Sequence, residues 1–397
     1  MSWQMVEIGD LGRIVTGDTP PKRNPEYYGS AYPFIKPTDM KIDHRHTIAY
    51  EEGYSEVAYE KYHRKLIPAG ATAVVTIGSI GQKLTLTHTP CFVNQAVNAV
   101  IPNEENFNSL YVYYLLKHNL HLIKSADTGA SSGRENVSKS NFSKIRVLAT
   151  LDIKMQDKIA LILDGYDSLI ENNHRRITLL EESARILYRE WFINLRHPNT
   201  QLLPSAWKIR SLSEIALVNR ASLHPRAMID SIQYIDISSV ETGAISTVTR
   251  MSYANAPGRA RRLVQHGDVI WSCVRPNRRS YALLWEPDDD VVVSTGMAVL
   301  TATQVPFTYL YLATTTDEFV EYLSSRATGA TYPAVNAKVF EEAPVLCPDP
   351  EVLEKFHEKC LPIFELCSKL HLQNSYLKEA RDALLPKLMS GEIQVQK

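Results

Sequence analysis

The stretch from Arg259 to Arg279 carries six arginines, no lysine and a single acid, Asp268. A guanidinium group is planar and forms paired hydrogen bonds with guanine or phosphate, and a carboxamide pairs in the same way with adenine. A charge run is usually a solvated face, but a lysine-free run interleaved with Trp271 and Asn277 favours recognition of a polyanion. We therefore predict DNA contacts in this half of the chain. The candidates are Arg259, Arg261, Arg275, Asn277, Arg278 and Arg279, with Tyr332 and Asn336 from a later polar loop.

Basic and polar residues are more dispersed in the first half of the chain. Lys36 and Thr38 flank Pro37 at the end of an expected strand, and Ser79, Gln82 and Lys83 lie in and after a glycine turn. Each of these alone fits an ordinary surface position, so the prediction rests on the group. The DNA-binding candidates in this half are Lys36, Thr38, Ser79, Gln82, Lys83, Arg134 and Lys139.

Motifs for catalysis, metal binding and nucleotide binding are incomplete. Asn24-Pro-Glu-Tyr27 lacks the second proline of an adenine methyltransferase motif, and the chain holds no phosphate-binding Gly-x-x-x-x-Gly-Lys-Ser/Thr loop. His44 and His46 have no further ligand at metal-site spacing, and Asp288 to Asp290 follow a proline as an acidic turn typically does. We therefore expect a noncatalytic chain that binds no metal or cofactor itself.

Composition restricts the class of protein further. The 397 residues are 44% hydrophobic and 22% charged, with a net charge of −1, so the chain is globular and any DNA binding must come from local patches. The five cysteines are scattered, and neither a signal peptide nor a long apolar run is present. A cytoplasmic protein is the expectation.

The chain contains an internal repeat, and the two copies are separated by close to 200 residues. Trp3 to Thr16 returns as Trp207 to Arg220, and Lys65 to Gly70 returns as Arg262 to Gly267. Short branched and aromatic runs between turn residues predict a mixed α/β head in each copy, at residues 1–150 and 198–348. Each head should contain one amphipathic helix, at 108–123 and at 309–323.

A different pattern follows each head. Apolar residues recur in alternating steps of four and three from Ile159 to Trp191 and from Ile363 to Leu388, which predicts spacer helices within 151–197 and 349–397. The two helices should pair antiparallel, giving an α+β fold of two heads with pseudo-twofold symmetry. Asn173 and Gln373 interrupt the two apolar seams. Either they face each other and fix the register, or each points to solvent where the seam frays.

Several segments taken in order resemble one known family. They are the two openings at Trp3 and Trp207, the turn Ile77-Gly-Ser-Ile-Gly81, the loop Thr328 to Asn336, and the helix ends Leu187 to Phe192 and Leu384 to Ile393. Together they resemble the specificity subunit of type I restriction-modification enzymes over essentially the whole chain. Two loops depart from the repeat. Ser272 to Arg279 has no glycine where the first copy has Ile77 to Gly81, so we expect a different loop path. In the other loop, the first copy has Ser131 to Val137 where the second copy has Thr331 to Val335.

The resemblance implies a noncatalytic subunit in which each head reads one half of a bipartite, asymmetric DNA target. It further implies two methyltransferase subunits that use S-adenosylmethionine and two restriction subunits that use ATP and Mg, with the spacer helices setting the half-site spacing. The off-seam residues Leu169, Leu179, Ile186 and Phe192 are candidates for methyltransferase docking or for packing on the chain's own heads. A standalone DNA-binding regulator and a coiled-coil scaffold are the alternatives.

Overall fold

The computed structural model describes residues 3–42, 44–127, 135–196, 207–224, 229–393 and 395. The chain divides into two compact units. The first comprises Met1–His174 and Leu372–Lys397, and the second comprises Arg175–His371. Each unit therefore contains one head and parts of both long helices.

The first unit holds three small sheets. The strand orders are β2-β8-β5-β6, β4-β3-β7 and the pair β1-β9. The strands are β1 (Trp3–Glu7), β2 (Gly12–Thr16), β3 (Tyr28–Ile35), β4 (Glu52–Tyr54), β5 (Thr72–Val75), β6 (Leu84–Leu86), β7 (Phe92–Val93), β8 (Val97–Pro102) and β9 (Arg146–Thr150). The helices are α1 (Glu56–Tyr62), α2 (Ser109–His118), α3 (Leu120–Ser125) and α4 (Lys139–Ser143). Every residue of β5 is buried, which explains its run of branched and small residues.

The second unit repeats this plan. Its orders are β11-β18-β15-β16, β13-β12-β17-β14 and the pair β10-β19. The strands are β10 (Lys208–Ser211), β11 (Ala216–Val218), β12 (Ser231–Ile235), β13 (Thr249–Ser252), β14 (Ala260–Leu263), β15 (Val269–Ser272), β16 (Tyr281–Leu283), β17 (Val291–Ser294), β18 (Met297–Ala302) and β19 (Pro344–Cys347). The helices are α6 (Leu212–Ile215), α7 (Phe307–Ala313), α8 (Asp317–Arg326) and α9 (Ala337–Glu341).

The strand pairing confirms the duplication seen in the sequence. The sheet β2-β8-β5-β6 has the same order of equivalent strands as β11-β18-β15-β16. In both heads one pair is parallel, β3 with β7 in the first and β12 with β17 in the second. The second head adds β14 to the edge of its mixed sheet, which therefore has four strands where the first head has three.

The single helix predicted in each head is wrong, because each is broken in two. In the first head Asn119 separates α2 from α3, and its side-chain amide donates to the carbonyl of Leu115. In the second head the hydroxyl groups of Thr314 and Thr315 donate to backbone carbonyls of α7, and the side chain of Thr316 caps the start of α8. Short polar side chains that bond to nearby backbone compete with helix continuation, which the apolar pattern does not register.

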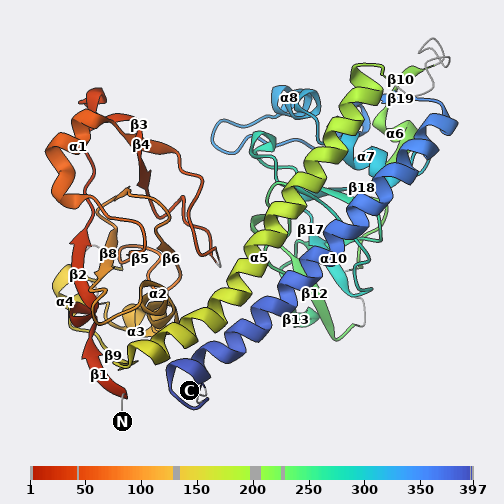
Figure 1. The fold of residues 1–397 in the computed structure, drawn as a ribbon. Helices are drawn as coiled ribbons and strands as arrows, with labels where there is room; N and C mark the ends of the chain where they lie inside the picture. The colour runs from red at the N-terminus through yellow and green to blue at the C-terminus, as the bar shows by residue number, and fades with distance from the viewer. Residues whose placement is uncertain are drawn as a thin grey trace. The chain divides into compact units, whose positions relative to one another are not determined.

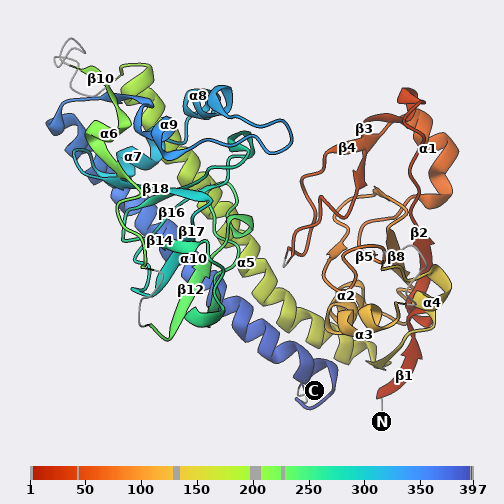
Figure 2. The ribbon, with the colours of Figure 1, turned by 180° about the vertical axis from the view of Figure 1, so that it is seen from behind.

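Two long helices each contribute residues to the cores of both heads. Helix α5 (Ile153–Tyr188) contributes Leu163 to the core of the first unit and Tyr188 to the core of the second. Helix α10 (Pro350–Met389) runs the other way, with Phe356 in the second core and Leu388 in the first. The pair is therefore antiparallel, and the two helices lie side by side in both views (Figures 1 and 2). The predicted fold of two mixed α/β heads with paired long helices is confirmed; the pseudo-twofold axis stays a prediction.

The seam of α5 matches the sequence pattern, whereas that of α10 is shifted by one residue over much of its length. Asn173 is buried as predicted, but Gln373 is exposed, and its neighbour Asn374 lies in the seam with 3% of its surface exposed. Leu366, predicted in the seam, is 36% exposed, and Cys367 is buried in its place. Arg381 is also fully buried, so a charged residue occupies a seam position that an apolar pattern skips.

In the part of the chain that the structure describes, no helix is long and apolar enough to cross a bilayer.

Candidate nucleic-acid interface

Two loops of the second head are joined along their backbones. We call Cys273–Arg279 the arginine loop and Thr328–Val335 the tyrosine loop. The amide of Arg275 donates to the carbonyl of Pro333 at 2.7 Å, and the amide of Val335 donates to that of Cys273 at 2.9 Å. A further bridge within the tyrosine loop joins Thr328 to Ala334. The two loops therefore form one fixed projection of the head.

The side chains of these two loops differ in how many contacts they make within the head. The guanidinium of Arg275 lies over the ring of Tyr332, 4.5 Å from its centroid, and donates to the carbonyl of Thr331 at 3.0 Å. Arg279 forms an ion pair with Asp317 at 2.5 Å. Asn277 and Arg278 are exposed. The structure thus brings Arg275, Asn277, Arg278 and Tyr332 together on one surface, with Arg279 partly neutralised beside them.

The other arginine candidates are held within the head. Arg259 pairs with Asp236 at 2.6 Å and donates to the hydroxyl of Tyr234 at 3.0 Å. Although partial burial opposes its ionisation, hydrogen bonds from Ser238, Tyr234 and Arg259 hold the pKa of Asp236 at about 2. Arg261 donates to the hydroxyl of Tyr253, above whose ring it lies. Both guanidinium groups are therefore bonded to side chains of their own head, Arg259 at an exposed position, and part of each donor set is already used.

Asn336 has a structural task. Its side-chain oxygen accepts a hydrogen bond from the amide of Val339 at 3.1 Å and caps α9. An N-cap of this kind typically contributes about 1 kcal/mol to stability.

The first-head candidates differ in how they are bonded within the head. Lys36 forms ion pairs with Glu51 at 2.8 Å and Glu52 at 3.6 Å, and the first of these contacts raises its pKa. Lys83 donates to the carbonyl of Pro37 at 2.9 Å. The remaining described candidates, Thr38, Ser79, Gln82 and Lys139, are exposed, and Arg134 lies outside the described residues.

The prediction that the glycine-free loop of the second head takes a different path is wrong at its start. In the first head the amide of Gly78 donates to the carbonyl of Glu135, and the amide of Val137 donates to that of Thr76. These bonds match those of the arginine loop one for one. Both loops also adopt positive φ there, +87° at Gly78 and +51° at Arg275. An arginine therefore occupies a left-handed position that the first head fills with glycine.

One charged residue of the first head, Arg45, is buried and serves the fold, which the sequence did not predict. Arg45 is 8% exposed and forms ion pairs with Asp164 and Glu171 of α5. Beside it, the rings of His44 and His174 stack with centroids 5.4 Å apart. The spacing of the two acids by one heptad is the available sequence signal, since it places them on one face of the helix.

Known proteins with the same plan share one function. A model of the type I restriction modification DNA specificity domain matches residues 1–182. The type I restriction enzyme MjaIX specificity subunit of Methanocaldococcus jannaschii is 24% identical over 410 residues, 99% of this chain and 94% of that protein. Over nearly its whole length the chain is therefore similar to type I restriction-modification specificity subunits, and the family's DNA specificity domain matches its first 182 residues.

Two further comparisons agree with this likeness. The HindI specificity subunit of Haemophilus influenzae is 34% identical over 150 residues, which are 37% of this chain and 31% of that protein. The crystal structure of the type I restriction-modification system S subunit from M. genitalium covers 97% of this chain and 96% of its own, with a TM-score of 0.55 and 17% identity. This second likeness shows the shared fold. The resemblance to type I restriction-modification specificity subunits found in the sequence is confirmed.

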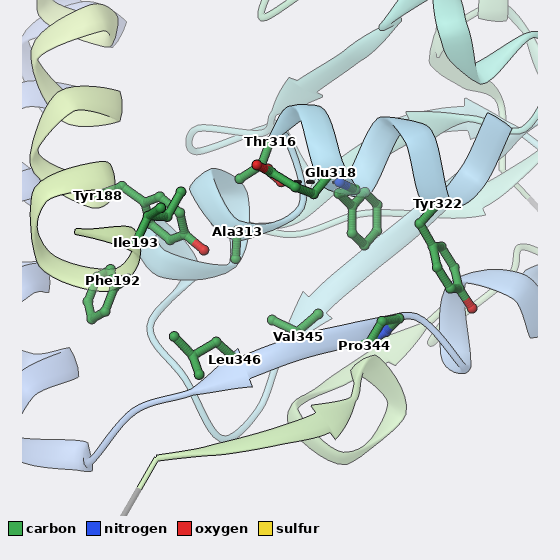
Figure 3. A pocket seen from close by; sticks show the side chains of 11 residues that line it. Tyr188, Phe192, Ile193, Ala313, Thr316, Glu318, Tyr322, Pro344, Val345 and Leu346 are labelled. Carbon is green, nitrogen blue, oxygen red and sulfur yellow. Dashed lines mark hydrogen bonds between the residues drawn. The ribbon is translucent and has the colours of Figure 1, made fainter. Parts of the chain in front are cut away.

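The chain also has a pocket of about 440 Å³ where α5 ends against the second head. Tyr188 and Phe192 from α5 and its terminal turn face Leu346 of β19 and Tyr322 of α8 across it (Figure 3). Glu318 is the charged residue among its described lining residues, so the pocket offers no cation for phosphate. Phe192 is 4% exposed and lies in the core of the second head, so of its two predicted roles it has packing on the chain's own head and not docking. The described residues include no group of three or more His, Cys, Asp or Glu side chains placed to hold a metal.

Proposed function

We propose that each head reads one half of a bipartite, asymmetric double-stranded DNA target. The heads would be residues 1–150 and 198–348, and the spacers 151–197 and 349–397. The observation that carries this proposal is the pair of equivalent loops with the same backbone bonds and different side chains, Gly78 in one head and Arg275 in the other. One scaffold with two different contact sets is what two dissimilar half-sites require.

The antiparallel helix pair supports the second part of the proposal, that the spacers fix the distance between half-sites. Helix α5 is continuous from Ile153 to Tyr188 and contributes Leu163 to the core of the first head and Tyr188 to the core of the second. Side-chain contact with both half-sites from one face of DNA requires a separation close to whole helical turns.

The partners follow from the likeness to this family. Two methyltransferase subunits carrying S-adenosylmethionine and two restriction subunits using ATP and Mg would assemble on this chain in the cytoplasm. Leu179 and Ile186 support a docking surface on α5, since they are 56% and 49% exposed and lie seven residues apart on one face. Leu169, 50% exposed, extends the same kind of surface toward the start of the helix.

Selection from random double-stranded DNA tests the proposal. The chain is assembled with its methyltransferase subunits, bound DNA is sequenced, and the chain alone is the control. A split motif with a fixed gap is the expected result. A single unsplit motif bound equally well by the chain alone would favour a standalone regulator, and no motif in either sample would favour a scaffold.

The spacing role has its own test. One heptad is inserted in both α5 and α10, so that the seam keeps its phase, and the gap between half-sites is read from the selected DNA. The gap is expected to lengthen while both half-sites keep their sequences. An unchanged gap would contradict the role of the helices as a spacer.

A further inference from the structure

The left-handed conformation of Arg275 is conspicuous because the equivalent position of the first head is Gly78. Left-handed backbone brings Cβ close to the carbonyl oxygen, so glycine adopts it without strain and arginine does not. The loop of the second head nevertheless keeps the same backbone hydrogen bonds with arginine in place. Strained non-glycine residues of this kind concentrate at functional sites, where the side chain offsets the cost.

The environment of Arg275 fixes its guanidinium group and leaves most of its donors unused. Tyr332 supplies a ring 4.5 Å below the group, and the carbonyl of Thr331 accepts one of its five N–H groups. Tyr332 itself is 66% exposed, so the stacked pair lies at the surface. A guanidinium held in one plane loses little further conformational freedom when it binds.

Arg275 differs from the nearby arginine candidates Arg259 and Arg279 in its ion pairing. Arg259 is paired with Asp236 and Arg279 with Asp317. Among the described residues, Arg275 forms no ion pair with a carboxylate, and its guanidinium donates to the carbonyl of Thr331. A planar cation that is half-buried, held beside an exposed tyrosine and not paired with a carboxylate among the described residues is suited to a flat acceptor pair outside the protein.

We propose that Arg275 reads a guanine base in the half-site of the second head, with Tyr332 as the residue that positions it. The inference rests on the proposed function. Guanine presents the O6 and N7 acceptors side by side in the major groove, and two N–H groups of one guanidinium match them. A DNA phosphate could accept the same two hydrogen bonds. A guanine contact makes binding depend on the DNA sequence, whereas a phosphate contact strengthens binding to every sequence.

The test uses the full chain assembled with its methyltransferase subunits and selection from random double-stranded DNA. Arg275→Lys keeps the charge but loses the paired donors, so preference for one G·C pair in one half-site is expected to fall roughly tenfold or more. Tyr332→Leu is expected to weaken the same preference, and the other half-site should be unchanged. Arg326→Ala is the matched control, because Arg326 also lies over a tyrosine, Tyr322, but on the regular helix α8.

Arg275→Gly separates a reading role from a structural one. Glycine adopts φ near +51° without strain, so this variant is expected to unfold at the same or a higher temperature while losing the guanine preference. A clearly lower unfolding temperature with intact preference would make Arg275 a structural residue and overturn the proposal.

Two further outcomes would also overturn it. Uniformly weaker binding of all sequences by Arg275→Ala, with Arg275→Lys like wild type and a smaller salt dependence for the alanine variant, would mean that the group contacts phosphate. Wild-type complex that enriches no split motif would remove the proposed function and this inference with it, whereas a wild-type motif that survives Arg275→Lys would remove this inference alone.

Discussion

The side-chain amide of Asn173 donates to the side-chain oxygen of Gln373, 3.0 Å away and 200 residues later in the chain. The same amide also donates to Asn374 at 2.9 Å. Asn374 in turn donates to the carbonyl of Ile170. Three carboxamides thus join α5 to α10 at the point where both apolar seams are interrupted. A polar pair of this kind specifies the register of two helices at some cost in stability.

Asn374→Leu is expected to destabilise the chain by about 1–2 kcal/mol, because it removes a partner of the buried Asn173 amide. The double variant Asn173→Leu with Asn374→Leu should recover that loss or exceed wild type, since two leucines fill the seam without unpaired polar groups. Denaturant unfolding measures both. Tyr376→Leu is the control, because Tyr376 lies on the same helix and is 61% exposed, and a loss there equal to that of Asn374→Leu would contradict the assignment of the seam.

Arg381 and Asp167 form a buried ion pair at 2.5 Å, with side-chain exposures of 0% and 4%. Tyr114 donates a further hydrogen bond to Asp167 at 2.9 Å. Arg381→Met should therefore cost about 3–5 kcal/mol, because it leaves a carboxylate buried without its cation. Lys369→Met, which breaks only the exposed pair with Glu365, should change stability by less than about 0.5 kcal/mol. Equal effects of the two variants on urea unfolding would refute this difference.

Burial raises the pKa of Glu181 above its ordinary value, and the charge of Arg185 opposes that rise only in part. Its carboxylate lies beside Gly243 and the hydroxyl of Tyr311. A carboxyl with a raised folded-state pKa adds stability below its ordinary pKa near 4.5 and loses that contribution as the pH rises through the folded value.

Glu181→Gln should therefore unfold at a higher temperature than wild type at pH 8, with the difference shrinking toward pH 4. Thermal unfolding followed across that range provides the measurement. The exposed neighbour Glu182, changed to Gln, is expected to give no such pH-dependent gain. A constant difference between Glu181→Gln and wild type at every pH would show that titration of this group is not its origin.

Leu179→Asp with Ile186→Asp should abolish copurification of the methyltransferase subunits and change the unfolding temperature of the isolated chain little. Both side chains are about half exposed, so the chain itself has little packing to lose. Ile209→Asp is the control, since Ile209 is a 74% exposed apolar residue that belongs to β10 and not to either long helix. Retained copurification by the double variant would place the docking surface elsewhere.

The sequence by itself determined the large features of this protein. Its repeat predicted two like heads, because a duplicated apolar framework folds twice into the same strands. The seam of α5 was also predictable, since Leu163, Ile170 and Ile177 recur with helical spacing and all three are buried. The order of the family's motifs was enough to show the resemblance to a specificity subunit.

Only the tertiary structure decided which charged residues serve the fold and which face outward. Arg45 and Arg381 are buried against acids of α5, whereas Arg275 stacks on a tyrosine at the surface. These arginines have the same chemistry, and their partners come from distant segments that no local pattern links. The left-handed backbone of Arg275 is likewise imposed by hydrogen bonds to a loop about 60 residues later, against the residue's own preference.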